Sequence, residues 1–104
     1  MEIGQVIKLL IKKRGLKQID VAERIGKSTT ALSQIINGNY KPQPETLEKL
    51  CEVLEVPVAL VHFLSITEDD VPKENIDLFR NLAPSMEKYL LDVFTAKKED
   101  LNLV

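Results

Sequence analysis

The sequence predicts an all-α fold in which five helices are followed by a short helical C-terminal extension. Apolar residues recur at helical spacing, and glycines, prolines and capping residues separate the helical segments. No stretch alternates apolar and polar residues in the way a half-exposed strand does. The chain has 104 residues, 44% hydrophobic and 29% charged, which is typical of one folded domain and excludes two full ones.

The first helix is predicted over about residues 2–14. Its apolar side chains recur at i, i+3, i+4, i+7 and i+8, and so share one face: Ile3, Val6, Ile7, Leu10 and Ile11. The basic run 12–14 suits the negative end of the helix dipole, and Gly15 is a natural residue for the turn that ends the helix.

Four further helices are predicted at about residues 18–25, 29–37, 44–54 and 57–64. Gly26 forces a tight turn, Ser28 is a good N-cap, and Pro44 suits the first position of a helix. The residues expected on the inner faces are Val21, Ala22, Ile25, Leu32, Ile35, Ile36, Leu47, Leu50, Cys51 and Leu54.

Residues 67–104 form the predicted extension, which begins with an acidic stretch. We expect two short helices there, separated by a break at Ala83 and Pro84 and closed by Lys97 and Lys98. Their apolar stripes are Ile76, Phe79 and Leu82, then Met86, Leu90, Val93 and Phe94. A segment this short cannot build its own core, so we expect it to pack on its own domain, a second copy or another protein.

Several classes of function are disfavoured by composition. Cys51 and His62, each the single residue of its type, do not supply the ligands of a metal site, and His62 has no plausible catalytic partners. We therefore expect neither an enzyme nor a bound metal or cofactor. The chain has no apolar run long enough to span a membrane and no secretory signal, so a cytoplasmic location is expected.

The charge is divided unequally along the chain. Residues 1–44 carry eight basic and three acidic residues, a net charge of +5, whereas residues 45–104 carry −7. This asymmetry favours a polyanionic partner for the first part alone.

Residues 18–37 carry the pattern of a helix-turn-helix: two short helices joined by a glycine-containing turn. The outward face of the second helix is polar but uncharged, consisting of Thr29, Thr30, Ser33, Gln34 and Asn37. Short hydroxyls and amides are suited to reading base edges in the major groove. Lys17, Lys27 and Lys41 flank this face and are predicted to meet phosphates.

This segment resembles the lambda repressor-like helix-turn-helix family, the Cro or XRE group of bacterial and phage regulators. The five-helix pattern carries the resemblance over residues 3–64, and the matching motif residues are Leu16, Gln18, Val21, Ala22, Ile25, Gly26, Ile35, Asn37 and Gly38. The resemblance implies a DNA-binding domain over residues 1–66.

Site residues are implied by the same resemblance. Ser28, Thr29, Thr30 and Gln34 would contact bases, with Ser33 at the groove edge, although Ser28 is equally well explained as an N-cap. Gln18 would contact a phosphate on one side, and Asn37 and Lys41 the backbone on the other.

The sequence departs from the family pattern in two ways. Lys17 stands where a capping Thr or Ser is common, and Ile11 and Ile36 replace a frequent Arg–Glu pair, a substitution that leaves the fold prediction intact.

Three functions remain open at this level. The first is a transcriptional regulator, a repressor that binds a palindromic operator in double-stranded DNA as a homodimer held through residues 72–94. The second is the antitoxin of a toxin–antitoxin pair, which binds a toxin and also represses its own operon. The third is an interaction adaptor that has lost DNA binding, which the +5 charge and the flanking lysines disfavour.

Overall fold

The computed structural model describes residues 1–97, and this part of the chain contains six α-helices, two 3₁₀ turns and no strand. The chain divides into two compact units, the first comprising Met1–Ile66 and the second beginning at Thr67. The all-α prediction is confirmed. Lys98, the predicted end of the last helix, and the rest of the extension to residue 104 lie outside the described residues.

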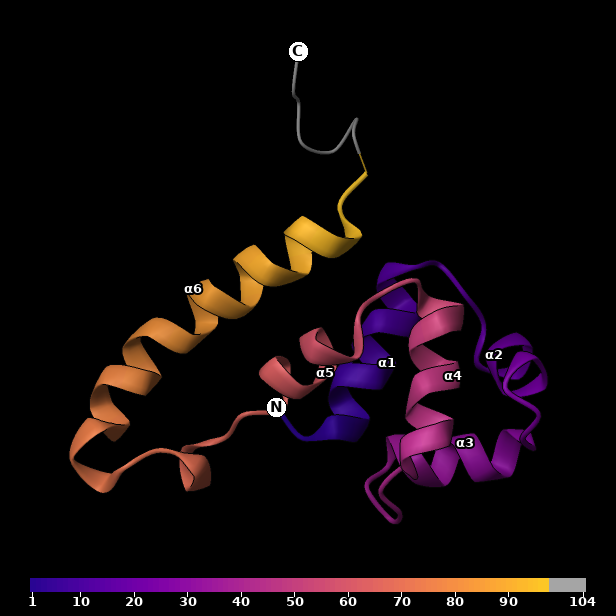
Figure 1. Ribbon diagram of the computed structural model, residues 1–104, viewed down its shortest axis with the longest axis horizontal. Coiled ribbons are helices and arrows are strands. Elements are labelled where there is room, and N and C mark those ends of the chain that lie inside the picture. The colour runs from indigo at the N-terminus through magenta and orange to yellow at the C-terminus, as the bar shows by residue number, and fades with distance from the viewer. Residues whose placement is uncertain (98–104) are drawn as a thin grey trace. The chain divides into compact units, whose positions relative to one another are not determined.

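The first unit consists of five helices. They are α1 (Ile3–Lys13), α2 (Gln18–Arg24), α3 (Thr29–Ile36), α4 (Pro44–Leu54) and α5 (Val58–Leu64). Each agrees with its predicted range to within a residue or two at either end. In this unit α1 lies between α5 on one side and α2 and α3 on the other (Figure 1).

A continuous apolar core joins these helices. Every residue predicted on an inner face is buried except Ile3, which is half-buried. The largest side chains with no appreciable exposure come from all five helices: Val6, Ile7, Leu10, Val21, Ile25, Leu32, Leu50, Leu54, Val61 and Leu64. Ile11 and Ile36, which replace the Arg–Glu pair, are both buried, as an apolar pair requires.

Arg14 contributes a contact that the sequence pattern did not predict. Its Nε donates to the Leu54 carbonyl over 2.6 Å and its Nη2 to the Glu55 carbonyl over 2.9 Å. Glu55 ends α4 in the left-handed conformation, with φ +56°. The guanidinium therefore satisfies backbone carbonyls at the end of α4 and ties that end to the C-terminus of α1.

The second unit contains two 3₁₀ turns, Glu68–Asp70 and Lys73–Asn75, and then one helix, α6 (Ile76–Thr95). The predicted break at Ala83 and Pro84 is wrong, because α6 continues through Pro84. Proline removes one hydrogen bond, the one to the carbonyl four residues earlier, and Pro84 is exposed, so water can solvate that carbonyl. The surrounding residues, such as Leu82, Met86 and Glu87, are strong helix formers.

Candidate nucleic-acid interface

A tight turn sets the angle between α2 and α3, which pack against each other. Gly26 adopts φ +72°, a left-handed conformation that costs a residue with a Cβ about 1–2 kcal/mol. The Lys27 amide donates to the Ala22 carbonyl over 2.9 Å and the Gly26 amide to the Glu23 carbonyl over 3.1 Å. These bonds close the end of α2 and direct the chain into α3.

Ser28 is the N-cap of α3. Its Oγ accepts a hydrogen bond from the Ala31 amide over 3.0 Å, which satisfies one of the free donors at the start of the helix. The N-cap explanation of Ser28 is therefore confirmed. Its hydroxyl hydrogen remains available as a donor, so capping does not conflict with a contact to a base.

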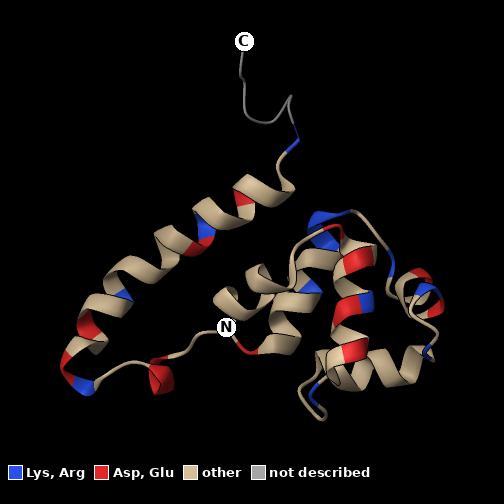
Figure 2. Ribbon diagram, viewed as in Figure 1, with Lys and Arg blue, Asp and Glu red and all other residues tan. Residues whose placement is uncertain are grey.

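The two sides of α3 differ sharply in character. Leu32, Ile35 and Ile36 are buried in the core. The opposite side carries residues at i, i+1, i+4, i+5 and i+8, of which Thr29, Thr30 and Asn37 are exposed while Ser33 and Gln34 are half-buried. α3 contains no Lys, Arg, Asp or Glu and stands out as an uncoloured helix in Figure 2. This side can therefore offer hydroxyl and amide groups to a partner without bringing a charge.

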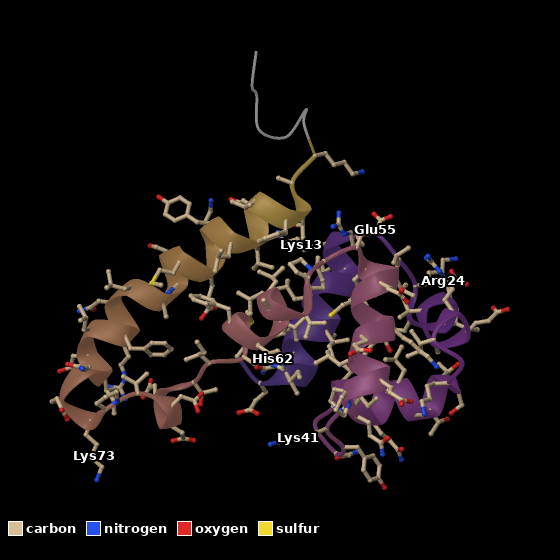
Figure 3. The ribbon with its side chains drawn as sticks, in the orientation of Figure 1. Lys13, Arg24, Lys41, Glu55, His62 and Lys73 are labelled. Carbon is tan, nitrogen blue, oxygen red and sulfur yellow. The ribbon has the colours of Figure 1, made fainter. Side chains whose placement is uncertain are left out.

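Three exposed lysines lie in and around the helix-turn-helix. Lys17 is the N-cap residue of α2 and makes no side-chain cap, and Lys27 lies in the turn between α2 and α3. Lys41, which is labelled in Figure 3, lies in the loop between α3 and α4. Among the ion pairs within residues 1–97, none involves these three lysines. Their ammonium groups are therefore free to neutralise phosphates.

An open hollow of about 270 Å³ lies beside α3 and brings several predicted contacts together. Gln34 lines it with Lys27 and Lys41, so a predicted base contact and two predicted phosphate contacts share one surface. The remaining lining residues are Ala31, Ile35, Tyr40, Pro42, Gln43 and Thr46.

Some predicted contacts lie outside the hollow. Lys17 and the half-buried Gln18 stand at the start of α2 and do not line it. Sequence reasoning overlooked Tyr40, whose side chain is 62% exposed and which lies next to Lys41. The sequence does contain a signal for Tyr40. It is an aromatic residue beside a lysine, in a loop that has no apolar periodicity.

The described residues contain little else with site chemistry. No group of His, Cys, Asp and Glu within residues 1–97 could hold a metal ion. Burial raises the pKa of the Cys51 thiol, and Cys51 packs in the core as predicted, whereas His62 is exposed on α5. No helix in the described range is long and apolar enough to cross a membrane.

The chain is similar to known proteins over this same region. A family model described as helix-turn-helix matches residues 7–61. The ImmF control region 10 kDa protein of Bacillus phage phi105 is 34% identical over 73 residues, which cover 70% of this chain and 78% of that protein. The immunity repressor protein of the same phage is 30% identical over 94 residues, covering 89% of this chain and 65% of that protein.

No solved structure matches the chain. The family model spans more than half of the chain and includes α2, the turn and α3. The uncharged polar side of α3 and the lysines around it lie within that match. The chain belongs to the helix-turn-helix family of DNA-binding regulators.

Proposed function

We propose that this protein is a sequence-specific repressor that binds a palindromic operator in double-stranded DNA as a dimer. The observation that carries the proposal is the uncharged polar side of α3, whose Gln34 shares a hollow with Lys27 and Lys41. A surface helix that only faces water usually carries Glu, Lys and Arg, which α3 lacks.

Base contacts are assigned to α3 and its N-cap. With α3 in the major groove, Ser28, Thr29, Thr30, Ser33 and Gln34 face the base edges. A glutamine amide can bond N6 and N7 of adenine together, and a threonine methyl suits the thymine methyl group. We therefore expect an A·T pair opposite Gln34.

Phosphate contacts are assigned to the residues around α3. They are Lys17, Gln18, Lys27, Asn37 and Lys41. The lysines neutralise phosphates on both sides of the groove, and the amides of Gln18 and Asn37 add hydrogen bonds that fix the orientation of the domain.

Dimerisation supplies the second half-site. One helix-turn-helix reads only a few base pairs, whereas two copies related by a two-fold axis read a palindrome with half-sites about 34 Å apart. Residues 72–94 are the proposed dimerisation segment. The similarity to a phage immunity repressor supports repression. We place the protein in the cytoplasm as part of this proposal.

A second candidate function is that of an antitoxin, favoured by the exposed apolar residues of α6. In that case α6 binds a toxin while α3 still binds the operator of the shared operon. Stable co-purification of the full-length chain with the product of the adjacent gene, in a 1:1 or 2:2 complex, is the result that would favour this candidate.

Selection from a random pool of duplex DNA with the full-length protein tests the proposal. We expect enrichment of two inverted half-sites whose centres are about 10–10.5 base pairs apart, or a multiple of that spacing. Failure to enrich any sequence contradicts sequence-specific binding. Enrichment of a single unpaired half-site contradicts the palindrome and the dimer while leaving base readout intact.

A further inference from the structure

The hollow beside α3 also contains the N-terminal end of α4 (Figure 1). Gln43, the N-cap residue of α4, and Thr46, its third residue, both line the hollow. Pro44 at the first position has no amide hydrogen, and Gln43 makes no side-chain cap. Within residues 1–97, no group accepts a hydrogen bond from the backbone amides of Glu45 and Thr46. The start of this 11-residue helix therefore keeps two free donors and the positive end of its dipole.

Thr46 brings a hydroxyl to the same place. The residue is only 8% exposed, yet in the described part of the chain its hydroxyl makes no hydrogen bond, whereas those of Ser28, Ser65 and Thr95 each bond a backbone group. No completely enclosed side-chain oxygen or nitrogen among residues 1–97 lacks a partner, so the Thr46 hydroxyl is reached from the hollow that the residue lines. A hydroxyl taken largely out of water without a partner costs free energy, which a valine of the same shape would avoid. The unpaired hydroxyl therefore points to a ligand that accepts a hydrogen bond.

The charge of the hollow has one sign. Among the described residues that line it there are two lysines, Lys27 and Lys41, and no acidic residue, so the lining carries +2. Glu45, whose amide is one of the free donors, has an exposed side chain that does not line the hollow. Two ammonium groups, a hydroxyl and a helix N-terminus therefore meet at one surface, and each of them favours an anion.

The size and position of the hollow indicate which anion it would hold. Its volume of about 270 Å³ lies below the roughly 300–1,000 Å³ of pockets that enclose a drug-sized molecule, so a small polar group fits better than a whole effector. Phosphate oxygens accept from amide, hydroxyl and ammonium groups alike. Gln34 lines the hollow as well, so an anion there lies next to the residue that we propose contacts a base, where the DNA backbone borders the major groove.

We propose that the hollow binds one phosphate group, with the Thr46 hydroxyl and the free amides of α4 donating to its oxygens and with Lys27 and Lys41 neutralising its charge. The phosphate belongs either to the DNA backbone or to free phosphate in solution, and experiment can separate these two sources. In the first case the proposal rests on the proposed function, to which it adds Thr46 and the start of α4 as parts of the DNA-binding surface.

Thr46→Val in the full-length protein tests the hydroxyl, because valine keeps the shape of the side chain and removes the donor. Since the lost bond is to a charged group, we expect about tenfold weaker binding to duplexes of any sequence, measured by fluorescence anisotropy. The slope of log affinity against log salt should stay the same, because a neutral donor releases no counter-ion. Thr46→Ser is the matched control, since it keeps the hydroxyl and should bind DNA as the natural chain does.

Sodium phosphate without DNA tests the site directly. In amide NMR spectra of the full-length protein, with sodium chloride exchanged for sodium phosphate at constant ionic strength, we expect saturable shifts of the Glu45 and Thr46 amides. The shifts should be much smaller in Thr46→Val. The start of α1 is the internal reference, because a capping box formed by Glu2 and Gln5 already occupies that end of the helix.

The two measurements together assign the source of the phosphate or overturn the proposal. Weaker DNA binding by Thr46→Val without shifts in phosphate assigns the site to the DNA backbone, shifts without a change in DNA binding assign it to free phosphate, and both results together show that it accepts either. A loss of DNA binding that is as large in Thr46→Ser as in Thr46→Val counts as no effect of the hydroxyl. No effect of the hydroxyl on DNA binding, combined with no saturable shift in phosphate, overturns the proposal.

Failure of the proposed function would be seen separately. Neither measurement requires a particular DNA sequence, so a failure to enrich any operator would count against sequence-specific repression and leave the assignment of the phosphate site unaffected.

Discussion

At the scale of single residues, Gly4 is the position where α1 comes closest to the end of α3. A Cβ at this residue would lie 2.4 Å from the Ile36 carbonyl oxygen and 2.6 Å from the Ile35 carbonyl oxygen. Both neighbours are backbone atoms and cannot move aside as a side chain can. Because Gly4 has no side chain, α1 can approach α3, the helix that we propose contacts DNA, this closely.

We predict that Gly4→Ala lowers the free energy of unfolding by about 1–3 kcal/mol or more, even though alanine favours helix formation, because the clash requires α1 and α3 to separate. Urea denaturation followed by circular dichroism measures this. Lys8→Ala, at an exposed position of the same helix, should change stability by less than about 0.5 kcal/mol. Equal stability of the two variants would show that the close approach is unimportant.

Lys41 provides a second prediction at this scale, which concerns salt. If its ammonium group neutralises one phosphate, Lys41→Ala should weaken binding to all DNA sequences about equally. The slope of log affinity against log salt should become shallower by about 0.9. Lys73→Ala, which removes an exposed lysine in the second unit, should leave that slope unchanged. A loss confined to one DNA sequence, with the slope preserved, would exclude a phosphate contact.

At the scale of the elements, the ion pair of Glu68 and Arg80 joins the first 3₁₀ turn to α6. The two hydrogen bonds from Arg80, and then its charge, hold the pKa of the Glu68 carboxyl below its usual value. A lowered pKa in the folded state means that this contact stabilises the folded chain above the ordinary glutamate pKa of about 4.3. The contribution is lost as the pH falls through the lowered folded value.

We predict that Arg80→Gln raises the pKa of Glu68 towards the ordinary glutamate value, because the charged donor is gone. Titration of the Glu68 carboxyl by NMR in the natural chain and in the variant measures this shift. An identical pKa in both proteins would mean that the ion pair is not formed in solution.

The helices of the first unit could be predicted from sequence because their signals are local. Ser28 caps α3 and Gly26 turns the chain with positive φ, and each effect depends on a few neighbouring residues. The break expected at Pro84 was wrong for the converse reason. In a local sequence pattern a proline predicts the end of a helix. It removes only one of the many hydrogen bonds of a 20-residue helix, however, and α6 continues through it.

Contacts between distant parts of the chain were beyond sequence reasoning. Arg14 bonds carbonyl groups 40 and 41 residues away, and nothing in its own neighbourhood indicates that partner. The hollow that joins Gln34 to Tyr40 likewise depends on how the loop folds back beside α3. The polar side of α3 could be predicted because helical spacing alone defines it; its DNA contacts remain predictions.

At the scale of the whole molecule, affinity for a palindrome depends on joining two DNA-binding units. We predict that Leu82→Asp binds a palindromic operator far more weakly than the natural chain but binds an isolated half-site equally well, because α3 is unaltered. Fluorescence anisotropy with both duplexes measures the two affinities. Unchanged affinity for the palindrome would mean that the exposed apolar residues of α6, among them Leu82, do not hold the dimer that binds DNA.

The central claim is that the polar side of α3 reads base sequence, and Gln34 tests it most directly. The measurement is the affinity of the natural chain and of Gln34→Ala for a set of operators, each with one base pair changed. The account predicts that Gln34→Ala loses about 1–3 kcal/mol on the preferred operator and becomes indifferent at a single A·T pair, with its preferences elsewhere unchanged. An unaltered base preference at every position would contradict it.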